Sequence, residues 1–287
     1  MEAIKNRYEF VALFDVENGN PNGDPDAGNM PRVDPETAHG IVTDVCIKRK
    51  IRNFIEIAQD DKSKYNILIK SDKALNTKFA DAYDFLGLDK GKKGANANDV
   101  EKAKAYICEN YYDVRTFGAV MSTGDNLCGT VRGPVQINFA RSIDPVFVQD
   151  ITITRQARTT EDRKATGDTE MGKKSLIPYG LYRVEGFVSA MQAQKVTGFN
   201  EEDLDLLWTA VINMFEHDRS AARGKMCVRK LYIFKHDSSL GNAPAQILFD
   251  KISVKKNDGV TVPRHFTDYE VSIDPQMPDG VTLIEKL

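Results

Sequence analysis

Acidic side chains gather around the loop that follows the first apolar stretch of the chain. Such carboxylates could hold a metal ion or act as a general base; they are Asp15, Glu17, Asp24, Asp26 and Asp34. His39 is the only histidine close to them in sequence, and neither a nucleophile elbow nor a pair of metal-ligand residues accompanies them. Solvation at the surface explains most carboxylates of this kind. We therefore predict no catalytic residue, no metal site and no cofactor.

Two loops approach known ligand-binding motifs without completing them. Gly167–Ser175 nearly matches a Walker A loop, but Lys174 occupies the Ser/Thr position and Pro178 blocks the helix that must follow. Asn18–Asn29 has the odd spacing of a calcium loop, yet its last residue is not the bidentate Glu that calcium needs. We interpret the first as a basic hairpin tip. The second is either a turn-rich loop with self-satisfied side chains or a loop that contacts RNA.

Three basic clusters indicate a different chemistry, the binding of phosphate groups. They lie at Lys48–Arg52, between Arg155 and Arg183, and at Arg219–Lys225, although the whole chain has a formal charge of -3 and a pI near 5.9. Each cluster alone is typical of a solvated surface. Each also lies beside a Gly- or Asn-rich turn or a helix end, and phosphate binding needs cations together with free N–H groups. This combination favours RNA as the ligand.

A strand and a helix must position the first cluster. The strand is predicted over residues 8–14, just before the polar loop. Asp34 can cap a helix, Pro35 suits its first position, and apolar residues at helical spacing carry it to about Ala58. On such a helix one polar stripe would hold His39, Thr43 and Lys50.

The middle of the chain is predicted to contain a helical insertion and then a strand. Residues 72–86 favour a helix that Gly87 ends, and residues 98–112 favour a second helix with Asn98 and Glu101 at capping-box spacing. Residues 131–141 then alternate as in a strand, with Val135, Ile137 and Phe139 on one face.

Residues 151–191 predict a projecting hairpin arm. Ile151–Arg155 alternates as a strand that leaves the core, and Ile177–Met191 returns as a long strand. Between them, residues 157–175 hold more cations than acids and almost no large apolar side chain except Met171. A flexible apolar side chain at a polar tip has nothing of its own to pack on. Met171 is therefore a wedge between bases, a side chain that enters a neighbouring molecule, or an adventitiously exposed residue.

The end of the chain completes a recognisable order of elements. Asn200 caps a helix predicted over residues 201–217, whose continuous apolar face includes Trp208. Strands follow near residues 228–235, 246–254 and 269–273. The order strand–helix–strand–strand–helix–strand, with inserts, predicts an α+β fold of the ferredoxin-like or RRM-like plan.

Length and cysteine usage limit the class of protein. The 287 residues suffice for one large domain with insertions or for two modest ones. The four cysteines have no paired spacing, which disfavours a disulfide framework or a zinc knuckle and suits a reducing compartment. The first residues do not form a signal peptide, and no apolar run could span a bilayer. We predict a soluble, cytoplasmic protein with no membrane partner.

Taken together, the loop and turn motifs resemble the backbone subunit of a type I-C CRISPR Cascade, a member of the RAMP superfamily. Four stretches carry the resemblance: Asn18–Pro25, Pro31–Asp34, Arg115–Ala119 and His217–Gly224. The resemblance implies an RRM-like palm, a helical finger insertion and a protruding β-hairpin thumb. The division it implies is palm at 1–59, finger at 60–113, palm or web at 114–150, thumb and returning strand at 151–190, and palm with the second helix at 191–287.

The resemblance also implies a function in antiviral defence. Several copies of such a subunit line up along one CRISPR RNA, and each thumb folds over the RNA and flips out a base. The exposed guide bases then pair with a target DNA strand. The implied partners are the CRISPR RNA, the target DNA strand, further copies of the chain, and the cap, large and small subunits of Cascade. In type I systems this subunit is not a nuclease, and a separate helicase–nuclease cleaves the target.

Residue by residue, the resemblance implies RNA contacts in three regions. The palm helix and its loop would contribute Asn20, Asn22, Arg32, His39, Thr43 and Lys50. The thumb would contribute Arg155, Arg163, Lys173 and Lys174, with Met171 as the wedge. The late turn would contribute Arg223 and Lys225. The chain departs from related subunits at His39, near which they often carry Lys or Arg.

Two other functions remain open from the sequence. One is a metal-dependent endoribonuclease that cuts target RNA with a loop aspartate, as in type III relatives, for which Asp24 or Asp26 would be the candidate. The other is a scaffold that binds only protein.

Overall fold

The computed structural model describes residues 2–60, 63–89, 96–155 and 170–287 of the chain. In its first half the elements are β1 (Tyr8–Gly19), β2 (Gly23–Asp24), η1 (Pro25–Ala27), β3 (Met30–Pro31), β4 (His39–Val42), α1 (Asp44–Ala58), α2 (Leu75–Leu86), α3 (Ala97–Asn110), α4 (Tyr112–Phe117), β5 (Gly118–Met121), β6 (Gly129–Arg132), β7 (Val135–Ile137) and β8 (Ala140–Pro145). In its second half they are β9 (Gln149–Arg155), β10 (Glu170–Val188), α6 (Ala190–Gln192), η2 (Ala193–Thr197), α7 (Glu201–Asn213), β11 (Lys225–His236), α8 (Ala245–Phe249), β12 (Ile252–Lys256), η3 (Phe266–Asp268), β13 (Tyr269–Ile273) and β14 (Val281–Glu285).

A large antiparallel sheet organises the described chain. Its strands run in the order β14-β11-β1-β10-β8-β4, and β7 and β9 also pair with β10. The first strand of the chain is thus central: Tyr8 pairs with both Val188 of β10 and Lys235 of β11. This position explains why residues 8–16 form an unbroken buried run rather than an alternating one, because a strand covered on both faces has no solvent side.

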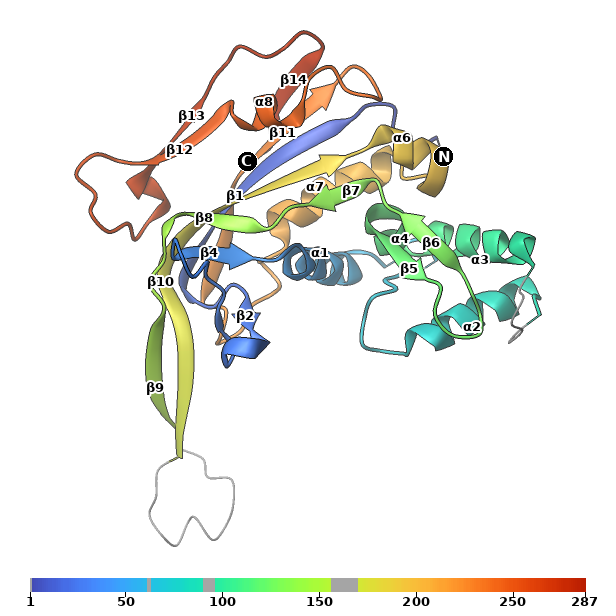
Figure 1. Ribbon diagram of the computed structural model, residues 1–287, viewed down its shortest axis with the longest axis horizontal. Coiled ribbons are helices and arrows are strands. Elements are labelled where there is room, and N and C mark those ends of the chain that lie inside the picture. The colour runs from blue at the N-terminus through green and yellow to red at the C-terminus, as the bar shows by residue number, and fades with distance from the viewer. Residues whose placement is uncertain (1, 61–62, 90–95, 156–169) are drawn as a thin grey trace, which may run out of the picture.

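Side chains on the two sides of β1 pack into two different hydrophobic layers. Phe10 and Phe14 pack in the core under α1 and α7, where both rings meet aromatic side chains. Val11 and Leu13 pack on the other face against α8 and the β12–β13 pair. Figure 1 shows these layers, with α1 and α7 below the sheet and α8, β12 and β13 above it. The mixed α+β class predicted from the sequence is therefore confirmed as an α+β fold with a large antiparallel sheet.

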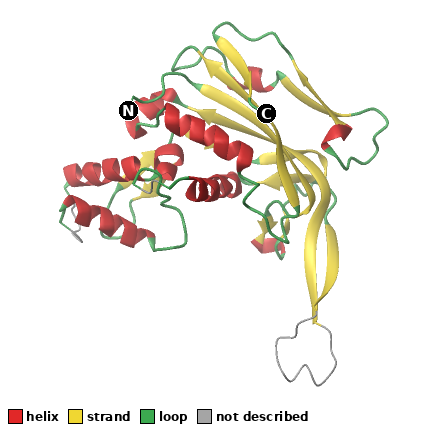
Figure 2. Cartoon of the chain, turned by 180° about the vertical axis from the view of Figure 1, so that it is seen from behind, coloured by secondary structure: helices red, strands yellow, loops and turns green. Residues whose placement is uncertain are grey.

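A third hydrophobic cluster lies away from the sheet. It joins α2, α3, α4, β5 and β6 around buried residues that include Phe79, Tyr83, Ile107 and Val131. The two predicted helices of this region are present, and the second begins after Asn96 rather than Asn98. Gly87 ends the first helix as predicted, with φ of 64°. Figure 2 shows this group of helices beside the sheet, on the side opposite the β9–β10 arm.

The described part of the predicted hairpin arm is present. β9 pairs with the outer part of β10, from Glu170–Arg155 to Leu176–Gln149. From Ile177 onward the same β10 strand pairs with β1. The arm is therefore a direct continuation of a central strand, and it projects from the body of the molecule (Figure 1). The predicted basic tip, residues 156–169, lies outside the described residues.

The prediction of a helix from Asp34 is wrong for its first ten residues, because α1 begins at Asp44. Asp34 Oδ1 instead accepts hydrogen bonds from the N–H groups of Glu36 and Thr37, which closes a turn with Ala38 at φ 57°. These contacts, led by the Glu36 N–H, lower the pKa of Asp34. Residues 39–42 then form β4 on the edge of the sheet. A carboxylate cap before Pro suits a tight turn as well as a helix, so the local signal could not separate them.

The last predicted helix is confirmed, with a shorter end. Asn200 caps α7, and the side chain of Asp203 completes a capping box by accepting the Asn200 N–H. The helix ends at Asn213 rather than at His217. Among the described residues, no helix combines the length and apolar character needed to cross a membrane.

Candidate nucleic-acid interface

The Asn-rich loop after β1 is tied to its neighbours by backbone contacts. The Asn20 N–H donates to the Ala222 carbonyl at 2.8 Å, so this loop and the late basic turn lie side by side. A Cβ on Gly19 would be 1.9 Å from the Arg223 carbonyl oxygen. Gly224 has φ of 62°, and a Cβ there would be 2.3 Å from the Asn18 carbonyl oxygen. The two glycines permit an approach that other residues would block.

The same loop is also tied to the start of α1. Asn22 Oδ1 accepts from both the N–H and the hydroxyl of Thr43, each at 2.9 Å. Thr43 is the N-cap of α1, and its hydroxyl oxygen accepts the Cys46 N–H. Asn22 and Thr43, two predicted RNA contacts, therefore hold the loop against the helix through each other.

Two predicted contacts share one acid between them. The buried ammonium of Lys50 pairs with Asp218, and Arg223 Nε lies 2.6 Å from the same carboxylate. Burial lowers the pKa of Lys50, and the charge of Arg223 lowers it further. Two cations thus face one anion, which leaves a net positive charge where α1 meets the late turn.

These residues line a groove of about 640 Å³, which we call the α1 groove. Its walls come from the loop, the start of α1 and the late turn, and they carry five predicted contacts besides Lys50: Asn20, Asn22, Arg32, Thr43 and Arg223. Arg49 also lines it. Arg49 is exposed, and its guanidinium has no hydrogen bond or ion pair with any part of the chain that the structure describes.

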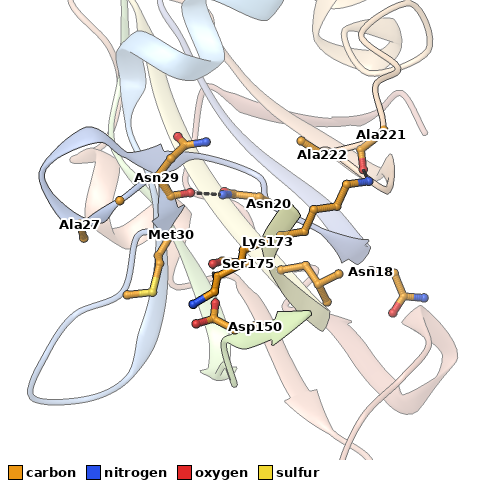
Figure 3. Close-up of a pocket in the computed structure, with 13 residues that line it drawn as sticks. Asn18, Asn20, Ala27, Asn29, Met30, Asp150, Lys173, Ser175, Ala221 and Ala222 are labelled. Atoms are coloured by element: carbon orange, nitrogen blue, oxygen red, sulfur yellow. Dashed lines mark hydrogen bonds between the residues drawn. The ribbon is translucent and has the colours of Figure 1, made fainter. Parts of the chain in front are cut away.

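A second hollow, of about 340 Å³, continues from the groove to the base of the arm. We call it the arm-base cavity; it is lined by Lys173, Lys174 and Ser175 of β10. It shares Asn20, Asn29 and Ala222 with the α1 groove, so the two hollows adjoin. Figure 3 shows Asn20 donating to the Asn29 carbonyl within the loop, beside Lys173 and Ser175 of the arm. Lys174 Nζ donates to the Ala221 carbonyl at 3.1 Å.

Two buried polar atoms in these walls have no hydrogen-bond partner within the described residues. They are Asn20 Oδ1 and Arg32 Nε. Asn20 is only 7% exposed, and it lines both hollows. Leaving a buried acceptor or donor unpaired costs about 1–3 kcal/mol, so each such atom in a native fold needs an explanation. A ligand that supplies a donor to Asn20 and an acceptor to Arg32 would remove both penalties.

Some predicted contacts lie away from this surface or cannot be placed. His39 pairs with Pro145 in the sheet and lines neither hollow. Lys225 lies 3.3 Å from Glu17 and lines a different hollow, with Arg229 and His265. For Arg155 and Met171 the structure gives the strand backbone only, and Arg163 lies outside the described residues.

The clustered acids are mostly engaged in ion pairs. Asp15 is buried and contacts Arg229 at 2.9 Å and the Tyr179 hydroxyl at 3.1 Å. Asp24 lies 3.3 Å from Arg32, and its side chain accepts the Asp26 N–H. The described ranges contain no group of three or more His, Cys, Asp or Glu side chains placed to hold a metal ion. The described end of the near-Walker stretch, from Glu170, is β-strand and not a helix start.

Arg49 belongs to the predicted Lys48–Arg52 cluster but was not singled out as an RNA contact, although a signal was present. Ile47, Ile51 and Phe54 mark the buried face of α1, and Lys50 falls on that face by helical spacing. Arg49 falls one position away, toward the groove. With the helix taken to begin at Asp34 instead of Asp44, its buried face could not be assigned correctly, and the two neighbouring cations could not be told apart.

The geometry defines a mixed α+β protein whose sheet carries a cationic groove and a projecting β-hairpin arm. The chain belongs to the CRISPR-associated protein Cas7 family, whose model matches residues 6–274. A CRISPR-associated protein Cas7 from Haloferax volcanii is 29% identical over 231 residues, which are 72% of this chain. The aligned part is 65% of that relative, so the chain matches slightly under two thirds of its length.

A solved structure shares the fold. A chain of a CRISPR RNA-guided surveillance complex in a pre-nicking state has a TM-score of 0.50 at 14% identity, over 79% of this chain and 78% of that one. A chain of another CRISPR RNA-guided surveillance complex has a TM-score of 0.48 at 15% identity, over 89% of this chain and 78% of that chain.

Proposed function

We propose that this chain is a backbone subunit that binds CRISPR RNA along the α1 groove and the arm-base cavity. One observation carries the proposal: Lys50 and Arg223 share a single acid in a groove whose walls also hold two unpaired buried polar atoms. A polyanion with hydroxyl groups complements such a surface. Membership of the Cas7 family, and relatives described as parts of CRISPR RNA-guided surveillance complexes, support the choice of CRISPR RNA.

The chemistry of the groove favours RNA bound through its backbone. Arg49 and Arg223 present guanidinium groups, which suit phosphate oxygens. The unpaired Asn20 Oδ1 is an acceptor, and a ribose 2′-hydroxyl is a donor that DNA lacks. Contacts of this kind carry no base information, so one subunit would accept any guide sequence.

The hand-like division is part of the proposal. Strands β11-β1-β10-β8, with α1 and α7 on one face, follow the strand order of a split βαβ plan, which supports an RRM-like palm. The third hydrophobic cluster supports a finger lobe, and it continues through β6 beyond residue 113. The arm would be the thumb, with Met171 as the wedge. Copies of the chain would assemble along one guide with the other Cascade subunits of a type I-C system in the cytoplasm, and the guide would pair with a target DNA strand.

We propose that the subunit is not itself a nuclease. Asp24, one of the two candidate catalytic acids, already serves the loop by pairing with Arg32 and accepting the Asp26 N–H. Its removal would therefore disturb the groove, whereas Asp26 is exposed and can be replaced more cleanly.

The test is to purify the protein from cells that express a CRISPR array and to examine its bound RNA. We expect RNA of one discrete length, and no cuts when complementary RNA and Mg²⁺ are added. Periodic cuts in the complementary RNA that Asp26→Ala abolishes would instead establish the endoribonuclease. Protein free of RNA would support a scaffold that binds only protein.

A further inference from the structure

Phe139 is an aromatic side chain that the fold turns out of its core. The alternation of residues 131–141 predicts that it shares one strand face with Val135 and Ile137, and both of these are buried. Phe139 is 55% exposed. The prediction for Phe139 was therefore wrong.

An extra residue in the strand causes the change. Ile137 pairs with Gly186, and Arg141 pairs with Arg183. Between these two pairs the chain advances by four residues from β7 to β8 but by only three residues along β10, so the β7–β8 side has one extra residue. The residues between β7 and β8 therefore form a bulge, after which Ala140 and Ser142 take the buried positions. A bulge of this kind re-aims a side chain, and bulges are frequent beside functional sites.

The bulge directs Phe139 into the α1 groove. Ala140 pairs with Val42, the residue before the N-cap of α1, so Phe139 lies near the start of that helix. Phe139 lines the groove together with Val45, which is also exposed, and with Arg49. An aromatic ring thus shares one groove with the cations of α1 and of the late turn.

We propose that Phe139 is a stacking platform for one base of the single-stranded RNA bound in the α1 groove. The inference rests on the proposed function and adds a contact to the base rather than to the backbone. Single-strand binding proteins combine a cationic track with aromatic side chains, because every base offers a π-face. A protein partner would need a broad apolar surface, whereas the exposed large hydrophobic side chains among the described groove residues are only Phe139 and Val45, with the smaller Pro25 and Ala222 beside them.

The test uses Phe139→Leu, Phe139→Tyr and Phe139→Trp in the full chain, with single-stranded oligouridylate as the probe. Phe139→Leu keeps an apolar side chain without a π-face, and we expect about a tenfold loss of affinity. Phe139→Tyr should bind as the wild type does. The salt dependence of binding should be the same in all three, because no phosphate contact changes.

Phe139→Trp supplies a direct readout. The natural chain has one tryptophan, Trp208, which is 3% exposed, so the new indole would be the one that solvent reaches. We expect its emission to be quenched as oligouridylate binds, with no change from Trp208 in the wild type. If Phe139→Leu bound oligouridylate with wild-type affinity, or if the emission of Phe139→Trp did not change when RNA bound, Phe139 would not be a stacking platform. The proposal that the chain binds RNA would still stand. If the tryptophan emission of Phe139→Trp changed with protein concentration and not with added RNA, residue 139 would instead lie in a contact between copies of the chain. Failure of the wild-type protein to bind RNA would overturn the proposed function itself.

Discussion

Replacing Arg49 and Arg223 together by Gln is expected to weaken single-stranded RNA binding roughly 30- to 150-fold. Both guanidinium groups line the α1 groove, and each is expected to make a charge-assisted contact to phosphate, about 1–1.5 kcal/mol apiece. Gln keeps much of the packing of the side chain and removes the charge. The slope of log affinity against log salt should become shallower by about 1.4, since two phosphates are no longer neutralised. Filter binding over a salt series measures both quantities.

The matched control removes two cations elsewhere. Lys5 and Lys255 are exposed residues that line neither hollow. Their double substitution by Gln lowers the net charge of the chain by the same amount. If this control weakened binding as much as the groove variant, the chain would bind RNA through its general charge and not through the groove.

Arg115→Ala is expected to lower the free energy of unfolding by about 3–5 kcal/mol. Arg115 is 6% exposed and contacts both oxygens of Asp203, at 2.9 and 2.8 Å. It also donates to the carbonyls of Cys108, Glu109 and Lys64, so one side chain joins α3 and the segment between α1 and α2 to the first turn of α7. Without it, Asp203 would be a buried charge with no cation. Urea unfolding measures the loss.

Two further variants test whether the loss of stability comes from the buried Arg115–Asp203 pair or from the removal of any arginine side chain. Arg115→Lys keeps the charge but cannot reach every acceptor that the guanidinium reaches, so an intermediate loss is expected. Arg219→Ala removes an exposed pair with Glu216 within one turn, and it should change stability by less than about 1 kcal/mol. An Arg115→Ala protein as stable as Arg219→Ala would show that the buried pair contributes little.

The sequence predicts much of the fold where the local signal is strong and continuous. α7 has both a cap and an apolar face, and Gly87 ends α2 because a left-handed residue was needed there. The turn at Asp34 was missed because capping residues also close turns, and because only pairing with β8, a hundred residues later, makes residues 39–42 a strand. Such long-range pairing decides between two local structures that the residues themselves allow.

For the candidate site, too, the sequence predicted some features and not others. Residue types marked the loop, the late turn and the arm as phosphate-binding, and the structure brings the Asn20 loop, Lys50, Arg223 and Lys173 to adjoining hollows. Residue type could not show which of these side chains point into the protein and which point into the groove. Lys50 proved buried beside an acid and Arg49 exposed, and Phe139 left the core through a bulge that no periodic pattern encodes.

Ultraviolet crosslinking of the purified protein–RNA complex, followed by mass spectrometry of the crosslinked peptides, tests most directly whether RNA lies in the groove. We expect crosslinks within residues 18–32, 43–53, 173–176 and 218–224, which line the two adjoining hollows. Crosslinks confined to β12 and β13, on the opposite face of the sheet, with none in those four segments, would contradict the proposed path of the RNA.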